Sequence, residues 1–165
     1  MQSFSFPPSA NKNAKILILG TMPGKKSLEM QEYYAYKYNV FWKIIFMLFK
    51  SDISENYNLK LKLLKDNYIA LWDSLQYCYR EGSADSNIND EIPNNFKLFY
   101  TEHRNIKHVF FNGTAAMKYY KKYVGFDEKH IFHLLPSTSP ANAYMSFKEK
   151  LKKWSLITEI LKNER

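Results

Sequence analysis

Residues 15–42, KILILGTMPGKKSLEMQEYYAYKYNVFW, decide the fold. Four consecutive aliphatic residues, Ile16 to Leu19, stop at Gly20, which is the pattern of a strand buried on both faces that ends at a loop. Gly20 and Gly24 bracket Pro23, so the loop can turn sharply and bring its N–H groups close to a bound molecule. The stretch therefore predicts a buried strand followed by a ligand-binding loop.

The second half of the same stretch predicts a helix in the core. From Val40 to Phe49 nearly every residue is apolar, and only Lys43 interrupts the run, so a helix there would be buried almost all round. Asn39 stands immediately before this run, where an asparagine can cap the first turn of a helix.

Helices and buried strands alternate along the rest of the chain. Ser27 and Thr114 are the expected N-caps of two helices, and Gly125 is the expected end of the second. The predicted strands are 68–72, 107–111 and 130–135; the predicted helices are 28–33, 51–66, 95–103, 114–123 and 147–161; and 1–14 and 76–95 are predicted to be an irregular lead-in and a long surface loop.

The order of these elements predicts an α/β fold. We expect a three-layer α/β/α sandwich with a four-stranded, mostly parallel sheet covered by helices on both faces. Ligands bind such sheets at the carboxyl ends of the strands. The loops expected to meet there are 20–27, 73–90, 112–114 and 136–143.

The composition predicts one domain, 1–165, that binds a polyanion. The 24 Lys and Arg residues exceed the 16 Asp and Glu residues, and the net charge of +8 favours a partner such as nucleic acid. Cys78 is the only cysteine, which leaves no disulfide or four-thiolate metal site within the chain and fits a reducing compartment. The longest apolar run, 44–49, is far shorter than a membrane span, so we expect a soluble, cytoplasmic protein.

Other chemistries are less well matched by the residues. The glycine-bracketed loop is similar to a phosphate-binding loop, but its glycines are too close together and Pro23 removes one amide. Ser137 or Ser139 could join His133 and Asp73 in a hydrolase triad, but no Gly-x-Ser-x-Gly turn surrounds either serine. The histidines show no metal-ligand spacing with carboxylates, so we expect no metal.

Five blocks of sequence carry a resemblance to a known family. They occur in order over residues 15–143, on the loops that are expected to meet. The blocks are Gly20-x-x-Pro-Gly24-x-x-Ser27-Leu28 with Tyr33-Tyr34-Ala35-x-x-x-Asn39-x-Phe41-Trp42; Leu71-Trp72-Asp73; Cys78-x-Arg80-x-Gly82-Ser83-x-Asp85-Ser86-x-Ile88; Phe111-Asn112-Gly113; and Leu135-Pro136-Ser137-Thr138-Ser139-Pro140-Ala141-Asn142-Ala143. In these blocks the chain resembles the uracil-DNA glycosylase superfamily, and within it the hypoxanthine-DNA glycosylase branch.

The resemblance implies that Asn39 is catalytic, because the essential amide of that branch precedes x-Phe-Trp. Other branches place an Asp or Asn before the motif proline to position the attacking water, but this chain has Met22 there. An amide is not a strong base, so Asn39 would orient water rather than deprotonate it. Leu135 replaces the His or Asn that stabilises the departing base in other branches, which leaves this task to the N–H groups of 20–24.

The resemblance also implies binding residues, no cofactor and a monomer. Tyr33, Tyr34, Phe41 and Trp72 are candidates to stack on an extruded base, although Phe41 and Trp72 fit the core equally well. The loop 137–143 would press into the duplex, although Pro140, Ala141 and Asn142 lack a long apolar wedge. The implied substrate-binding residues are Gly20, Thr21, Met22, Pro23, Gly24, Tyr34, Trp72, Asp73 and Asn112; the implied DNA-binding residues are Lys25, Lys26, Ser137, Thr138, Ser139, Pro140, Ala141 and Asn142.

The predicted function is that of a DNA repair glycosylase acting on the nucleoid. It would flip a deaminated base out of DNA, with hypoxanthine first and uracil and xanthine as further candidates, and hydrolyse the N-glycosidic bond to leave an abasic site. Two alternatives stay open: a catalytically silent nucleic-acid-binding module on the same fold, and a phosphate-loop enzyme.

Overall fold

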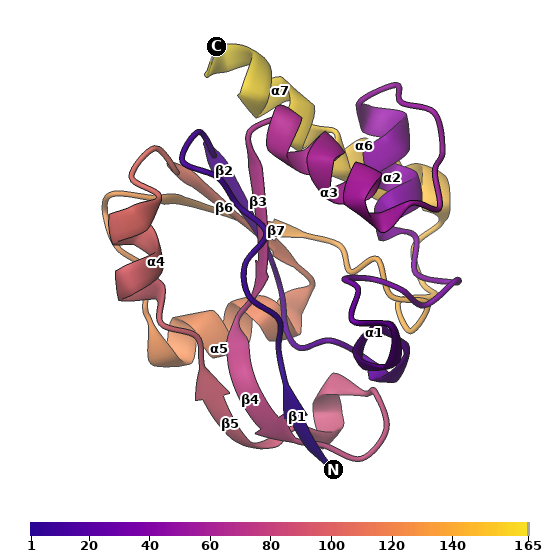
Figure 1. Cartoon of the computed structure of the whole chain (residues 1–165), viewed down its shortest axis with the longest axis vertical. Helices are drawn as coiled ribbons and strands as arrows, with labels where there is room; N and C mark the ends of the chain where they lie inside the picture. Colours follow the sequence, from indigo (N-terminus) through magenta and orange to yellow (C-terminus); the bar gives the residue numbers. More distant parts are fainter. Residues whose placement is uncertain (165) are drawn as a thin grey trace.

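The computed structural model describes residues 1–164 and has a parallel sheet at its centre (Figure 1). The strand order is β3-β2-β6-β7 and all three pairings are parallel, so the predicted four-stranded sheet is confirmed. The strands are β2 (Ile16–Gly20), β3 (Ile69–Asp73), β6 (His108–Asn112) and β7 (Ile131–Leu135).

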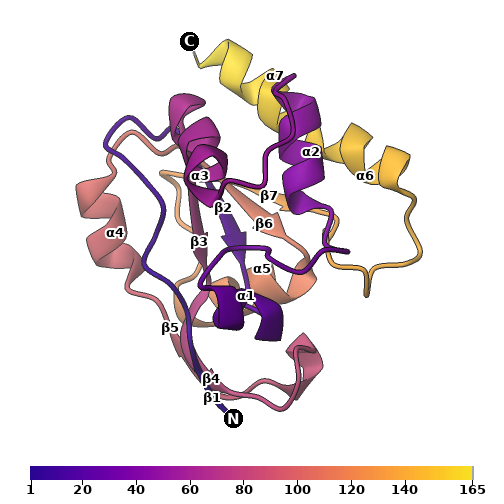
Figure 2. The same ribbon diagram turned by 45° about the vertical axis from the view of Figure 1, so that its right-hand side comes forward.

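Helices cover both faces of this sheet and give three layers, as predicted (Figures 1 and 2). Side chains of β2 alternate between the two cores: Ile16 and Ile18 pack toward one helical layer, and Leu17 and Leu19 toward the other. All four are fully buried, which explains the continuous apolar run in the sequence. The first layer holds α2 (Phe41–Leu48), α3 (Tyr57–Asp66), α6 (Phe147–Trp154) and α7 (Leu156–Asn163), and the second holds α4 (Phe96–Glu102) and α5 (Thr114–Tyr123).

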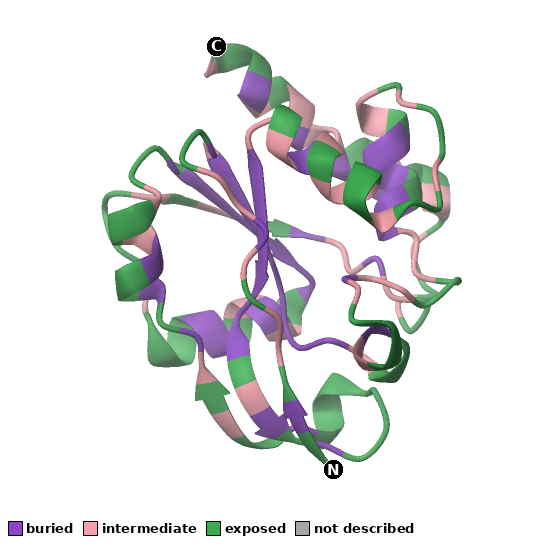
Figure 3. Ribbon diagram, in the orientation of Figure 1, coloured by how far each residue is buried: buried purple, intermediate pink, exposed green. Residues whose placement is uncertain are grey.

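A second, antiparallel sheet lies beyond the carboxyl end of β3, and it corrects two predictions. It joins β1 (Gln2–Phe4), β4 (Leu75–Tyr79) and β5 (Asn89–Pro93), so 1–14 is not wholly irregular and 76–95 is mostly a hairpin. The polar sequence of β5 has little strand propensity, and its pairing with β4 overrides that preference. The remaining loop, 80–88, contains a short 3-10 turn, η1 (Asp85–Asn87), and is largely exposed (Figure 3).

Two predicted helix caps are wrong. The helix α1 (Lys25–Met30) has Gly24 as its N-cap, and Ser27 is a buried residue inside it whose hydroxyl accepts the Ala35 N–H at 3.1 Å. The N-cap of α5 is Gly113, whose φ of +93° is left-handed, and Thr114 is the first helical residue.

Other helix ends follow the sequence more closely. Gly125 ends α5 as predicted, because its N–H bonds to the Tyr120 carbonyl at a φ of +81°. The helix predicted at 51–66 begins only at Tyr57, where the Asn56 side chain caps it by accepting the Leu59 N–H. The helix predicted at 147–161 divides at Ser155 into α6 and α7.

Among the helices of residues 1–164, none combines the length and apolarity that a membrane crossing needs.

Candidate active site

The loops that follow β2, β3 and β6 meet in one pocket at the carboxyl ends of these strands. The pocket encloses about 930 Å³, within the size range of small-molecule sites. Asn39 and most of the predicted binding residues line it, namely Gly20, Thr21, Met22, Pro23, Gly24, Lys25, Lys26, Tyr34, Asp73, Asn112, Ser137, Thr138, Ser139, Pro140 and Ala141.

Trp72 does not line the pocket, and the prediction that it stacks on a base is wrong. Its ring centroid lies 5.1 Å from that of Phe96 and 4.9 Å from that of Phe99, both on α4. Its indole N–H donates to the Phe6 carbonyl at 3.0 Å. Strand side chains alternate between faces, so Trp72 faces away from the core that contains Leu71.

The loop 20–24, called the donor loop below, presents free backbone donors. The N–H groups of Thr21, Met22 and Gly24 have no hydrogen-bond acceptor within residues 1–164. The loop itself is held in place, since the Leu75 N–H donates to the Thr21 carbonyl at 3.2 Å. Several fixed, unpaired N–H groups on one pocket wall can stabilise negative charge on a bound group.

Gly20 is required by the close approach of two side chains. A Cβ at this position would lie 2.6 Å from Oδ1 of Asp73 and 2.8 Å from the hydroxyl oxygen of Tyr34. Tyr34 has a left-handed φ of +55°, and its ring stacks on Phe41 with a centroid separation of 4.1 Å. The absent side chain of Gly20 therefore lets a carboxyl and a phenol converge beside the donor loop.

Asp73 is a buried carboxyl without a protein partner for one of its oxygens. It is 3% exposed, and neither its Oδ2 nor the Tyr34 hydroxyl has a hydrogen-bond partner within residues 1–164. Burial, and then the negative charge of Asp85, raises the pKa of Asp73 to about 7, while the charge of Arg80 opposes the shift. Burial also raises the pKa of Tyr34, with a further contribution from Asp73. A large fraction of Asp73 is therefore protonated near neutral pH and able to donate.

Asn39 has one end fixed and one end free. Its Oδ1 accepts the Phe41 N–H at 3.0 Å, so it satisfies a donor in the first turn of α2 although the N-cap itself is Val40. Its Nδ2 has no acceptor within the described residues, and the side chain lines the pocket. The Val40 N–H donates to the Thr138 carbonyl at 3.1 Å, which joins this segment to the loop after β7.

Asn112 fixes that same loop. Its Nδ2 donates to the Thr138 hydroxyl at 2.9 Å, and its Oδ1 accepts the Thr138 N–H at 3.0 Å. Both ends of the amide are therefore used to position the pocket wall. Asn142, predicted to bind DNA, does not line the pocket and donates to the Ser137 carbonyl at 3.2 Å.

One wall of the pocket was predicted as a loop but not by its residues, since 73–90 was expected to reach the site and only Asp73 in it was named as a binding residue. The loop 80–88, called the hairpin loop below, contributes Ser83, Ala84, Asp85 and Ser86. The signals for it in the sequence are its place after the predicted strand 68–72 and the Cys78-to-Ile88 block, which contains this loop. The hydrolase triad is not assembled, because His133 pairs with His108 at 3.0 Å between ring nitrogens.

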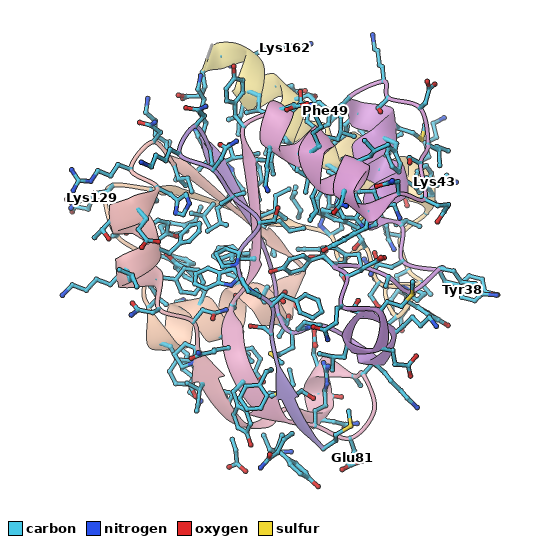
Figure 4. All side chains as sticks on the ribbon, in the orientation of Figure 1. Tyr38, Lys43, Phe49, Glu81, Lys129 and Lys162 are labelled. Carbon is cyan, nitrogen blue, oxygen red and sulfur yellow. The ribbon has the colours of Figure 1, made fainter. Side chains whose placement is uncertain are left out.

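Exposed tyrosines and lysines lie on or next to segments that line the pocket. Tyr36, which lines it, lies edge-on to Tyr38, with ring centroids 5.4 Å apart. Tyr38 and Lys43 extend into solvent on the side of the molecule that carries α1 and α2 (Figure 4). Tyr144, just past the 137–142 loop, is fully exposed at 101%. Such a rim suits a partner with bases to stack on and phosphates to neutralise.

Comparison with known proteins agrees with this geometry. The family model described as the uracil DNA glycosylase superfamily matches residues 7–161. Two similar proteins, both named hypoxanthine DNA glycosylase, come from Methanosarcina barkeri (35% identity; 94% of this chain and 97% of the relative) and Methanosarcina acetivorans (35% identity; 92% and 95%). The solution NMR structure of a candidate uracil DNA glycosylase from Methanosarcina acetivorans superimposes with a TM-score of 0.83 at 33% identity, covering 98% of this chain and 99% of that one.

The fold and its pocket define an α/β protein with a pocket at the carboxyl ends of its parallel strands, where such folds bind ligands. The chain belongs to the uracil DNA glycosylase superfamily, as the resemblance implied.

Gly20→Ala is expected to destabilise the fold, because the new Cβ would overlap the Asp73 carboxyl and the Tyr34 hydroxyl. Overpacking of this kind costs about 1–3 kcal/mol, measurable as a shift in the urea unfolding midpoint. Gly24→Ala is the matched control, since its Cβ would lie at an ordinary 3.5 Å from Ser83 Oγ and its φ of −73° suits any residue. Equal stability of the two variants would contradict the packing at Gly20.

Asp73→Asn is expected to flatten the pH dependence of stability. Between the ordinary carboxyl pKa of 3.8 and about 7, Asp73 is protonated in the folded chain and ionised in the unfolded chain. The unfolded state therefore binds fewer protons, and the free energy of unfolding of the wild type falls as pH rises through this window. Asparagine cannot ionise, so the Asp73→Asn variant should lose this fall in the free energy of unfolding. Asp52→Asn, at an exposed position, is the control and should show the same fall as the wild type. Identical pH profiles for the wild type and Asp73→Asn would show that Asp73 ionises normally.

Proposed function

We propose that this chain is a DNA repair glycosylase that draws hypoxanthine out of DNA into the pocket and hydrolyses its N-glycosidic bond, leaving an abasic site. The class, a DNA N-glycosylase, follows from membership of the superfamily and from the relatives. The observation that carries the proposal is the meeting of three elements in one pocket: the free N–H groups of the donor loop, the buried carboxyl of Asp73 and the Asn39 amide.

The state of Asp73 fits a deaminated base. Hypoxanthine has an N–H donor next to a carbonyl acceptor, and a protonated carboxyl offers an acceptor and a donor with the same spacing. The Tyr34 hydroxyl adds a further unpaired group beside it. Uracil and xanthine carry the same N–H and carbonyl pattern, so they are further candidate substrates.

The hydrogen-bonding edge of Asp73 does not by itself exclude adenine. Adenine is rejected because it is harder to flip out of the duplex than its deamination product. A protonated carboxyl can also pair with adenine, which has a ring acceptor next to an amino donor. Adenine in a duplex is correctly paired, whereas its deamination product is mispaired and costs less to flip out. The proposed enzyme therefore selects a base by how readily it leaves the stack and then by its fit to the pocket.

The residue at position 22 limits how the pocket can activate water. Met22 is buried among apolar residues that include Leu75 and Cys78, so no carboxylate stands at that position to take a proton from water. Asn39, held by the Phe41 N–H, would orient the water, and the donor loop would receive the negative charge of the departing base. The sugar would carry the positive charge in a dissociative transition state.

Contact with the duplex is proposed for the pocket rim. Lys25 and Lys26 are exposed at the start of α1, where they can neutralise phosphates. Pro140 and Ala141 line the pocket but are too short to fill the space left by a flipped nucleotide. Tyr144 follows them with its whole ring in solvent, and we propose that it stacks in that space.

Asn39→Ala is expected to slow excision of hypoxanthine from an inosine-containing duplex by about 10²-fold or more, because the amide acts on the water in the transition state. Excision is measured under single-turnover conditions as strand cleavage after alkali, and DNA affinity, measured by fluorescence anisotropy, should stay close to that of the wild type.

Asn56→Ala is the matched control for helix capping. Asn56 accepts the Leu59 N–H at 3.1 Å at the start of α3 and does not line the pocket. Losing such a cap costs about 1 kcal/mol of stability and should leave excision unchanged. An equal, small loss of excision rate in Asn39→Ala and Asn56→Ala would show that Asn39 acts only as a helix cap. A wild-type chain that binds DNA but releases no base would instead support the catalytically silent binding module.

Tyr144→Ala is expected to reduce excision from a duplex by about tenfold, the value of one lost stacking contact, and to leave excision from the same single strand nearly unchanged. Tyr144→Phe keeps the ring and should behave as the wild type on both substrates. A parallel loss on duplex and single strand would show that Tyr144 does not replace the extruded base.

A further inference from the structure

Arg80 lies behind the donor loop and is fully buried, at 1% exposure. Its Nη2 donates to the Pro23 carbonyl, its Nη1 donates to the Ser83 carbonyl at 3.3 Å, and Nη1 lies 3.6 Å from Oδ1 of Asp85. A buried guanidinium needs ion pairing and hydrogen bonds, and these contacts supply them to both Nη atoms, while Nε has no partner within residues 1–164. The contacts also connect two walls of the pocket, the donor loop and the hairpin loop.

A second contact joins the same two walls. The Lys25 N–H donates to Oγ of Ser83 at 2.9 Å, immediately after the donor loop. Ser83 therefore accepts two hydrogen bonds: its hydroxyl accepts the Lys25 N–H, and its carbonyl accepts from Arg80. The hairpin loop holds the donor loop on both sides of Gly24.

The contact with Pro23 has a chemical consequence for Gly24. The Pro23 carbonyl and the Gly24 N–H belong to one peptide group. A cation hydrogen-bonded to the oxygen of a peptide draws electron density from its N–H, which becomes a stronger donor. The Gly24 N–H is one of the free donors of the pocket wall.

We propose that Arg80 is a positioning residue for base excision: by holding and polarising the peptide between Pro23 and Gly24, it makes the Gly24 N–H a fixed and strong donor to the departing base. This inference rests on the proposed glycosylase function. Negative charge develops on the base only as the glycosidic bond breaks, so Arg80 acts on the rate of that step and not on DNA binding.

The test compares Arg80→Gln, Arg80→Lys and Arg104→Gln on an inosine-containing duplex, with the single-turnover rate, the dissociation constant and the thermal midpoint measured for each. Arg80→Gln is expected to lower the rate by up to about 10²-fold, the effect of one donor lost outright, with the dissociation constant nearly unchanged. Arg80→Lys keeps the charge without the planar fork and should recover part of the rate. Arg104 is exposed at the end of α4, so its variant should match the wild type.

Ser83→Ala keeps the test decisive if the Arg80→Gln chain does not fold. Ser83 is exposed and loses only its bond to the Lys25 N–H, so the variant should keep its thermal midpoint and show a smaller loss of rate without loss of affinity. A folded Arg80→Gln chain as fast as Arg104→Gln would overturn the proposal. If Arg80→Gln is unfolded, wild-type rates for both Ser83→Ala and Arg80→Lys would overturn it. A wild-type chain without excision activity would instead overturn the proposed function.

Discussion

The absence of a side chain at Gly20 is the constraint on which the site depends. Because Gly20 has no Cβ, the Asp73 carboxyl and the Tyr34 hydroxyl can lie close to the end of β2. The Cβ of any other residue at this position would overlap both groups. The carboxyl is buried at this strand end, and burial, together with the charge of Asp85, raises its pKa toward neutrality. One glycine at a strand end thus makes room for the buried carboxyl and the phenol on the same wall of the pocket.

The parallel sheet was predictable because its signals are local. Each strand is a short apolar run that ends at a polar or glycine-containing loop, and strands in such an order place those loops at one edge. The small sheet was missed for the opposite reason: the Asn-Asp-Glu of β5 has no strand pattern of its own and is extended only because β4 lies beside it. The position of Arg80 could not be predicted either, since no local sequence pattern indicates that a guanidinium will be buried against the carbonyl of Pro23.

Most residues named from the resemblance line one pocket, but the resemblance did not indicate the faces on which they lie. Trp72 and Asp73 are adjacent in one block, yet the strand alternation sends the indole into the core with α4 and leaves the carboxyl at the pocket. Asn112 lies at the pocket as predicted, but both ends of its amide bind Thr138. In this site, many polar groups hold walls in place, and few remain free for a substrate.

The free groups are the Asn39 amide nitrogen, the donor-loop N–H groups and the Asp73 and Tyr34 oxygens. We propose that these groups together hydrolyse the bond between a base and its sugar. The most direct measurement is mass spectrometry of the products when an inosine-containing duplex is incubated with the protein in heavy-oxygen water. We expect free, unlabelled hypoxanthine and one labelled oxygen on the sugar carbon that held it. Intact inosine after long incubation, or a released base that carries the label, would contradict the proposal.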